Sequence, residues 1–464
     1  MNAFTALRLL FVFALLGQAL SPAWAAASKR QPNIVYFLAD DLGWADVGYH
    51  GSDIKTPSID RLAASGAKLE SFYAQPVCSP TRAALMTGRY PIRYGLQTGV
   101  IKPWASYGLS LKERTLAEIL RASGYRTLLL GKWHLGHVSR EYLPLQRGFE
   151  YHYGHYNGAI DYFTHERDGG LDWHRNGKAV REEGYTTELL ARDAVGLIEK
   201  HDQSRPLFLC VTFNAPHSPF EVPEKYTAPY GNRKGNSRLY AGMVAAVDVA
   251  IGRIMDAFKK RGMMEDTIFV FSSDNGGPSP GKITNNGPWS GAKGTLNEGG
   301  VRVVACVSWK GHIPADTVVN EPLHMVDWLP TFARLAGASL EGVLPLDGRD
   351  AWSTLAEGKP TPHEYILLNV EPTKTRSQGR GAVRSGQWKL ILHGDPSGSG
   401  AGAQLFDLSK DRGEKNDVAA GHPEVAARLF GALRGYANAA VDPFVAGDKP
   451  DNFHVPKVWG EFSQ

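Results

Sequence analysis

Short apolar runs alternate with longer segments of helical character along most of the chain. Four of these runs are short and apolar enough to be buried strands: residues 34–39, 127–130, 207–213 and 268–271. Strands that alternate with helices are typical of a fold with a mostly parallel sheet. We therefore expect an α/β fold in which a large mixed, mostly parallel sheet is flanked by helices.

Three segments between these runs carry signals for the start or the end of a helix. Residues 58–66 follow Thr56 and Pro57, residues 115–124 close with a glycine, and residues 240–262 have a longer amphipathic pattern. These segments are the expected helical cover of the sheet.

The pattern changes near residue 340, where Gly, Leu and Pro become frequent. The later segments that resemble short antiparallel strands are residues 364–370, 381–392 and 404–408. Residues 423–439 indicate a final helix, and an irregular tail follows. We predict a catalytic domain over residues 26–340 and a smaller α+β subdomain with an antiparallel sheet over residues 341–464.

The first residues have the pattern of a secretory signal peptide. Arg8 precedes an apolar run over residues 9–20, and the small residues that follow allow cleavage after Ala25 at an A-x-A-like site. The run is interrupted by Gly17 and is shorter than the roughly 20 residues of a spanning helix, which makes a membrane anchor the weaker alternative. We expect residues 1–25 to be removed. The mature protein is then exported, to a periplasm, the medium or a lysosome, without stable membrane insertion.

Composition excludes several classes of protein. The chain has 464 residues, of which 43% are hydrophobic, enough for a large core. The net charge of +4 is spread without a Lys/Arg-rich run, which argues against nucleic-acid binding. Three cysteines are too few for a disulfide scaffold. Cys210 and Cys306 lie in apolar runs, as buried thiols do, whereas Cys78 lies in a polar, proline-flanked stretch.

Polar side chains follow each of the four apolar runs. In chain order they are Asp40 and Asp41, Lys132 and His134, Asn214 and His217, and Asp274 and Asn275. Ligands of open α/β sheets bind outside the carboxyl ends of the strands, so these side chains are expected to share one site. The two aspartates of the first run, with Asp274 and Asn275, offer only oxygen ligands. Such ligands favour Ca²⁺ or Mg²⁺ over zinc, and several oxygens with few waters favour Ca²⁺.

Cys78 opens the segment C-S-P-T-R, in which Pro80 fits the first turn of a helix. A helix N-terminus attracts anions, and Arg82 adds a fixed positive charge. An unmodified cysteine in this position would be an activated thiolate, so a cysteine hydrolase with His134 or His217 as its base is one alternative. That alternative leaves the cluster of oxygen ligands without a purpose.

The chain resembles the type I sulfatases, whose C-x-P-S/T-R motif carries a cysteine that is oxidised to formylglycine. The segments that carry the resemblance are C-S-P-T-R-A-A-L-M-T-G-R from Cys78, L-A-D-D-L-G at 38–43, G-K-W-H-L-G at 131–136, A-P-H at 215–217, S-S-D-N-G-G at 272–277, A-K-G-T-L-N-E-G-G-V-R at 292–302 and L-F-D-L-S-K-D-R-G-E-K-N-D at 405–417. They extend over nearly the whole predicted mature chain. Thr81 stands where many members have Ser. The resemblance implies an alkaline-phosphatase-like fold and a sulfuric ester hydrolase.

The resemblance also implies a set of roles. A maturation enzyme converts Cys78 to formylglycine, and the hydrated aldehyde is the nucleophile toward sulfur. The implied ligands of one Ca²⁺ are Asp40, Asp41, Cys78, Asp274 and Asn275. The other implied roles are charge stabilisation by Arg82 and Lys132, base catalysis by His134, and action on the leaving-group side by His217 and Lys293.

Within the family, the chain is most similar to the N-acetylgalactosamine-4-sulfatase type, arylsulfatase B, and its bacterial relatives. The segments concerned are residues 93–101, 142–149, 161–166, 240–248 and 327–331. This similarity implies a sulfated glycan with 4-sulfated galactose or N-acetylgalactosamine, or an aryl sulfate, as the substrate.

Residues 151–173 are rich in aromatic residues and histidine, as either a sugar-stacking loop or a buried loop anchor would be. For His152, His155 and His165 we expect packing or surface roles.

Two further functions remain open at this level. A phosphodiesterase or phosphonate monoester hydrolase can use the same scaffold, although phosphoryl substrates usually call for more metal charge than one ion. A non-catalytic binder of sulfated glycans would result if Cys78 is never modified.

Overall fold

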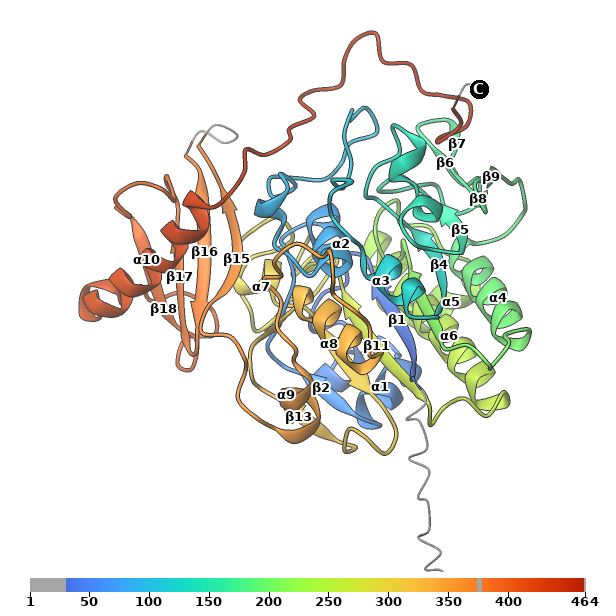
Figure 1. The fold of residues 1–464 in the computed structure, drawn as a ribbon, viewed down its shortest axis with the longest axis horizontal. Coiled ribbons are helices and arrows are strands. Elements are labelled where there is room, and N and C mark those ends of the chain that lie inside the picture. The colour runs from blue at the N-terminus through green and yellow to red at the C-terminus, as the bar shows by residue number, and fades with distance from the viewer. Residues whose placement is uncertain (1–30, 374–377, 463–464) are drawn as a thin grey trace, which may run out of the picture. The chain divides into compact units, whose positions relative to one another are not determined.

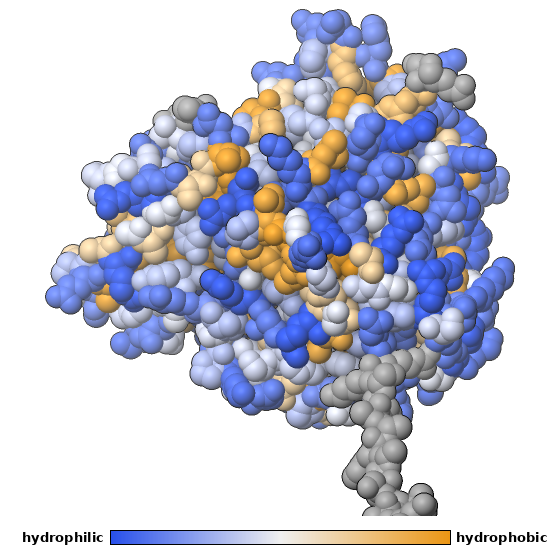
Figure 2. Space-filling model, viewed as in Figure 1, coloured by the Kyte–Doolittle hydropathy of each residue, from blue (hydrophilic) through white to orange (hydrophobic). Residues whose placement is uncertain are grey.

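The computed structural model describes residues 31–373 and 378–462 of the 464-residue chain. The predicted signal peptide, residues 1–25, lies outside the described residues. None of the helices in these two ranges has the length and apolar character needed to cross a membrane. On the face shown in Figure 2, hydrophilic side chains dominate, and apolar ones gather in small groups near the middle.

A mixed sheet runs through the centre of the fold (Figure 1). In spatial order its strands are β13 (Thr317–Val319), β2 (Ala67–Leu69), β12 (Ala305–Ser308), β11 (Thr267–Ser273), β1 (Asn33–Ala39), β10 (Leu207–Thr212), β4 (Arg126–Lys132), β5 (Tyr151–His155), β8 (His174–Arg175) and β9 (Lys178–Ala179). Neighbours from β11 to β5 are parallel throughout. Antiparallel pairs with β12 and β8 flank this block. The predicted mostly parallel sheet is confirmed.

The four predicted apolar runs are the middle strands of this sheet, β11, β1, β10 and β4. Along β1, Ile34, Tyr36 and Leu38 belong to one hydrophobic core, whereas Val35 and Phe37 belong to another. A strand buried on both faces is apolar at every position, which is why these runs lack a polar alternation.

Helices cover both faces of the sheet. The core that includes Val35 is completed by α1 (Pro57–Ala64), α4 (Thr186–Glu199) and α6 (Gly235–Lys260). The core that includes Ile34 is completed by α2 (Cys78–Thr87), α3 (Leu116–Ala122), α8 (Trp328–Leu335) and α9 (Trp352–Glu357). Of the predicted helices, α3 lies within the expected bounds, α1 begins one residue before them, at Pro57, and α6 begins before residue 240. Thr115 forms a capping box with Glu118 at the start of α3.

Shorter elements lie around the main sheet. They are β3 (Phe72–Tyr73), β6 (Glu166–Arg167), β7 (Gly170–Leu171), α5 (Glu224–Thr227), α7 (Glu298–Val301) and β14 (Leu323–His324). β6 and β7 form a small antiparallel hairpin, and β3 pairs in parallel with β14.

The last part of the chain forms an antiparallel sheet of β15 (Ile366–Glu371), β16 (Arg380–Ser385), β17 (Trp388–Leu392) and β18 (Ala403–Asp407), followed by α10 (Pro423–Asn438). The predicted strand segment 381–392 is a hairpin, because the chain reverses at Gly386, whose φ is +54°. Ile366, Leu368 and Ile391 of this sheet share a core with Tyr73 and Leu296 of the preceding region. The division near residue 340 stays a prediction.

Candidate active site

The predicted oxygen ligands meet at the carboxyl ends of β1 and β11. Ala39 pairs with Ser273, so the residues that follow each strand are neighbours. The backbone N–H of Asp41 donates to Asp274 Oδ1 over 3.2 Å, and Asn275 Nδ2 donates to Asp41 Oδ1 over 2.7 Å. Asp40, Asp274 and Asn275 are fully buried, and Asp41 is 4% exposed. The four side chains form one buried cluster.

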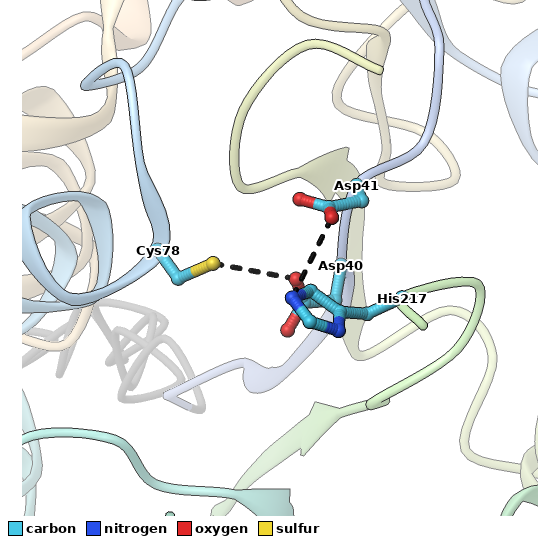
Figure 3. Close-up of side chains that lie close together, drawn as sticks. All are labelled: Asp40, Asp41, Cys78 and His217. Carbon is cyan, nitrogen blue, oxygen red and sulfur yellow. Dashed lines mark hydrogen bonds and ion pairs between the residues drawn. The ribbon is translucent and has the colours of Figure 1, made fainter. Parts of the chain in front are cut away.

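Cys78 is the first residue of α2 and faces this cluster. Its Sγ lies 3.4 Å from Asp40 Oδ1 (Figure 3). Burial, together with Asp274 and Asp40, raises the pKa of the Cys78 thiol far above its usual range. The expectation that an unmodified Cys78 would be an activated thiolate is therefore wrong, because burial and the two carboxylates outweigh the helix terminus. The geometry disfavours the cysteine-hydrolase alternative.

Three cations contact the carboxylates. Arg82 Nη2 donates to Asp40 Oδ2 and to Asp274 Oδ2, each over 3.1 Å. Lys132, the last residue of β4, pairs with Asp40. Lys293 Nζ lies 2.7 Å from Asp41 Oδ1. The structure thus brings together the cations that were predicted from three separate segments.

The two central carboxyl groups differ in acidity. Burial alone would raise the pKa of Asp40, but Lys132, His217 and Arg82 hold it well below its usual range. Burial and the negative charge of Asp40 raise the pKa of Asp274 to about 6. Asp274 therefore carries a proton more readily than an ordinary aspartate does, because burial and the charge of Asp40 outweigh the effect of Arg82 and Lys132.

His217 lies closer to the carboxylates than its predicted role on the leaving-group side implies. Its Nε2 is 3.6 Å from Asp41 Oδ2. One ligand atom from each of Asp40, Asp41, Cys78 and His217 lies within 4.8 Å of the others (Figure 3), a group that could hold a metal ion. The histidine in A-P-H could have been considered as a ligand, because it too follows a strand, β10.

The residues present fit a divalent cation. Asn275 Oδ1 is buried and has no hydrogen-bond partner among the described residues. A buried acceptor without a partner is costly, and a cation is one partner that would satisfy it. The pKa of Asp274 is raised by burial and by Asp40, and a bound cation would stabilise the ionised form of this carboxyl group. Carboxylate and amide oxygens are ligands that hard cations prefer.

His134 lies beyond the end of β4 with a left-handed backbone, φ +58°. Its Nε2 is 3.0 Å from the carbonyl oxygen of Ile101, while its buried Nδ1 has no partner among the described residues. A Cβ on Gly158 would lie 2.4 Å from the imidazole Cε1, so only glycine leaves room for the ring. Burial, with Lys132 and Arg82, lowers the pKa of His134 well below its usual range. The imidazole is therefore neutral, with Nδ1 free to accept a proton.

A pocket of about 290 Å³ opens onto these residues. Cys78, His134, His217 and Lys293 line it, and so do Lys102 and Arg167. No sequence pattern points to Lys102 or Arg167, because each is an isolated cation outside the recognised motifs.

The remaining predicted features have structural roles. Tyr156, Tyr162 and Trp173 are at most 1% exposed, so the aromatic side chains of residues 151–173 mainly anchor a buried loop. His152, His155 and His165 are also buried, as expected for packing histidines. Asn214 Oδ1 accepts a hydrogen bond from Thr186 Oγ1, and Asn214 does not line the pocket.

Comparisons with known proteins agree with this geometry. The Sulfatase family model matches residues 32–338. Arylsulfatase J of Mus musculus is 35% identical, over 90% of this chain and 78% of its own length. N-acetylgalactosamine-6-sulfatase of Mus musculus is 33% identical, over 79% of this chain and 73% of its own. The crystal structure of Ps i-CgsB in complex with k-i-k-neocarrahexaose superposes with a TM-score of 0.82 at 34% identity, covering 89% of this chain and 94% of that one.

Proposed function

The chain belongs to the sulfatase family and is a sulfate ester hydrolase, and from this premise we propose that it desulfates a sulfated sugar through a formylglycine made from Cys78. The observation that carries the proposal is the position of Cys78. Its Sγ lies 3.4 Å from Asp40 Oδ1, at a pocket that Lys293 and His134 also line. A nucleophile derived from this side chain meets a sulfate group where positive charge is concentrated.

The cations of the pocket suit a sulfate ester. Arg82 and Lys132 are fixed by their contacts with Asp40, so they need no reorientation when negative charge develops on the sulfate oxygens. Lys293 and His217 are partly exposed and line the pocket, as groups on the leaving-group side would. A cation or a proton donor at the departing oxygen lowers the barrier to cleavage of the sulfur–oxygen bond.

The proposed metal is one Ca²⁺ held by Asp40, Asp41, Asp274 and Asn275 together with residue 78. His217 is a further candidate ligand. The oxygen-rich donor set supports Ca²⁺ over zinc. When bound, the ion supplies positive charge that polarises the sulfate group.

His134 is the proposed base. Its Nδ1 is free of a hydrogen bond in the described structure, and its imidazole is neutral. The hydrated aldehyde at residue 78 supplies the hydroxyl groups, and His134 accepts a proton from one of them. Ile101 fixes the orientation of the ring by accepting from Nε2, and Gly158 leaves room for it.

The proposed substrate is a glycan with a 4-sulfated galactose or N-acetylgalactosamine unit. The Ps i-CgsB complex with a neocarrahexaose and the relationship to an N-acetylgalactosamine sulfatase support a sulfated sugar. The sulfate position is inferred from the sequence resemblance alone. Export and maturation of Cys78 by a dedicated enzyme also belong to this proposal.

The test is sulfate release from galactose 4-sulfate, N-acetylgalactosamine 4-sulfate, its 6-sulfate isomer and 4-nitrophenyl sulfate, each with and without EDTA. We expect release from a 4-sulfated sugar, loss of activity with EDTA and recovery with Ca²⁺. Intact-mass analysis should find an aldehyde in place of a thiol at residue 78. Preference for the 6-sulfate would refute the proposed position, and a fully active enzyme with an unmodified thiol would refute the mechanism. Faster turnover of the matching phosphate ester would favour phosphoryl transfer.

A further inference from the structure

We propose that Lys102 and Arg167 form a second anion subsite in the active-site pocket, held in place by the C-terminal tail, residues 440–459. The substrate class would then be an oligosaccharide with a further anionic group beside the sulfate that is cleaved. This inference rests on the proposed function and adds a determinant of specificity to it.

These two cations are not used by the chemistry proposed above. Arg82, Lys132 and Lys293 each contact a carboxylate of the central cluster. Lys102 is exposed and has no ion-pair partner in the described part of the chain. Arg167 Nε lies 3.2 Å from Asp168 Oδ2, a partner that is itself 44% exposed. Neither terminal amino group of Arg167 has a hydrogen-bond partner within residues 31–373 and 378–462.

The tail fixes the hairpin that carries Arg167. Leu171 of β7 donates to the carbonyl oxygen of Lys457 over 3.0 Å, and Trp459 donates back to the carbonyl of Leu171 over 2.9 Å. Trp459 Nε1 donates to the carbonyl oxygen of Arg167 itself over 3.0 Å. Figure 1 shows the red tail leaving α10 and reaching the region of β6 and β7. The tail therefore contacts this hairpin through a single parallel bridge, between Leu171 and Val458.

The same tail holds the segment that carries Lys102. Trp104 Nε1 donates to the carbonyl oxygen of Gly447 over 3.3 Å, and Lys102 Nζ lies 6.0 Å from the Trp104 ring centroid. Phe453 contacts Trp104 at 6.3 Å and Trp459 at 6.2 Å between ring centroids. The aromatic contacts through Phe453 thus connect Trp104, which lies beside Lys102, with Trp459, which binds the hairpin of Arg167.

Lys102 has no ion-pair partner among the described residues, and Arg167 pairs only with the exposed Asp168, so both can attract additional negative charge on a ligand. The pocket of about 290 Å³ holds the sulfate-bearing unit, and a sulfate ester or a carboxylate on the same or the next unit can reach its cationic residues. Exposed charge pairs are individually weak and are screened by salt. The preference for a second anion is therefore expected to be roughly tenfold for the two cations together, and to decline as the ionic strength rises.

The experiment compares KM for neocarrabiose with one sulfate ester, neocarrabiose with two, and a monosulfated chondroitin disaccharide, whose second anion is a carboxylate. In the wild-type enzyme we expect a lower KM for one or both of the two-anion sugars. The sugar that has the lower KM identifies the second anion as sulfate or carboxylate. The double variant Lys102→Ala/Arg167→Ala should bring the ratio of KM values between two-anion and one-anion sugars close to one. Arg181→Ala is the matched control, because Arg181 is 71% exposed, pairs with Glu166 of the same hairpin and does not line the pocket.

Trp459→Ala tests the tail. We expect the KM ratio to shift in the same direction as in the double variant, with faster amide exchange at residues 166–171, while the thermal midpoint reports whether the fold is retained. Trp459→Phe keeps an aromatic ring and should restore part of the preference.

Equal KM values for one-anion and two-anion sugars in the unmodified chain would overturn the inference and leave the proposed function standing. Hydrolysis of 4-nitrophenyl sulfate without hydrolysis of any of the sugars would overturn both the proposed substrate and this subsite. An Arg181→Ala effect as large as that of the double variant would also overturn the inference.

Discussion

The structure contains two buried clusters of charged side chains that differ in the acidity of their carboxyl groups. Residues 290–298 connect them, because Lys293 contacts one cluster and Glu298 belongs to the other. One is the active-site cluster around Cys78. The other, the α7 cluster, consists of Glu298, Lys389 and Glu414, between α7 and the C-terminal sheet. Lys389 Nζ lies 2.9 Å from Glu298 Oε1 and 2.7 Å from Glu414 Oε1, and all three side chains are buried.

The two clusters differ in the acidity of their carboxyl groups. In the α7 cluster, Lys389 and Arg302 outweigh the effect of burial and lower the pKa of Glu298 to about 2. In the active-site cluster the pKa of Asp274 rises to about 6, and Asn275 Oδ1 has no partner in the described ranges. Buried charge alone therefore does not identify a functional site. The active-site cluster is distinguished by a carboxyl group with a raised pKa and a buried acceptor without a partner in the described ranges, both near an open pocket.

The largest expected effect separates the two clusters by activity. Cys78→Ala removes the proposed nucleophile and should lower kcat by at least about a thousandfold. Because the Cys78 side chain makes only one polar contact with the described residues, to Asp40, the thermal midpoint should change little. Sulfate release and a thermal melt measure both quantities. A variant that keeps its activity would show that the nucleophile is elsewhere.

A substitution in the α7 cluster should lower the stability of the fold. Lys389→Met leaves Glu298 and Glu414 buried without their shared cation, and breaking a buried pair in this way costs about 3–5 kcal/mol. Urea unfolding gives the change in free energy, and Lys410→Met is the control, because Lys410 is 83% exposed. A loss below about 1 kcal/mol would mean that the α7 cluster does not stabilise the fold.

Acidity should distinguish the clusters in metal-free enzyme. The folded-state pKa of Asp274 lies above its unfolded value, so the folded state binds the extra proton between about pH 4 and 6. Stability from this group therefore rises as the pH falls through that window and is lost as the pH rises. Glu298 acts in the opposite sense, because its stabilisation is lost as the pH falls from 4.5 toward 2.

Asp274→Asn should remove the gain in stability between about pH 6 and 4 and leave the loss of stability that Glu298 causes at lower pH. Unfolding free energies measured in EDTA from pH 3 to 7 provide the test. In the unmodified chain, protonation of Asp274 should also weaken Ca²⁺ binding below about pH 6. An identical pH profile in Asp274→Asn and the unmodified chain would contradict the assignment.

The smallest expected effect concerns the link between the two clusters. Glu414 Oε2 accepts from Ser290 Oγ over 2.5 Å and from the Glu298 backbone N–H over 2.8 Å. These two contacts lie on either side of Lys293 in the chain. Ser290→Ala should cost about 1 kcal/mol of stability. Its effect on kcat should be less than tenfold and larger for sulfate esters with poor leaving groups. An equal effect on kcat for all esters would show that Ser290 does not help to position Lys293.

Much of the fold and the centre of the site could be predicted from the sequence, because both depend on local patterns. Strands buried on both faces give continuous apolar runs, and the residues that follow parallel strands must meet at one edge, as Asp40 and Asp274 do. The sequence prediction did not separate the two strands at Gly386, although R-S-G-Q at 384–387 is a polar segment of the kind that forms turns.

Three features depend on contacts between distant segments: the position of His217 near the candidate metal ligands, the pocket cations Lys102 and Arg167, and the link through Glu414. Glu414 lies in a segment that carried the family resemblance, yet its partners Lys389 and Ser290 lie elsewhere in the chain. No local pattern encodes such pairings.

The path of the tail has a consequence for the order in which the protein matures during synthesis. Asp40 and Asp274, which follow β1 and β11, leave the ribosome long before the tail, residues 440–459, does. Until those residues emerge, Trp104 and the hairpin at Arg167 lack the partners described above. In a chain that folds as it is synthesised, the site around Cys78 can thus assemble before the proposed anion subsite acquires the contacts that hold it.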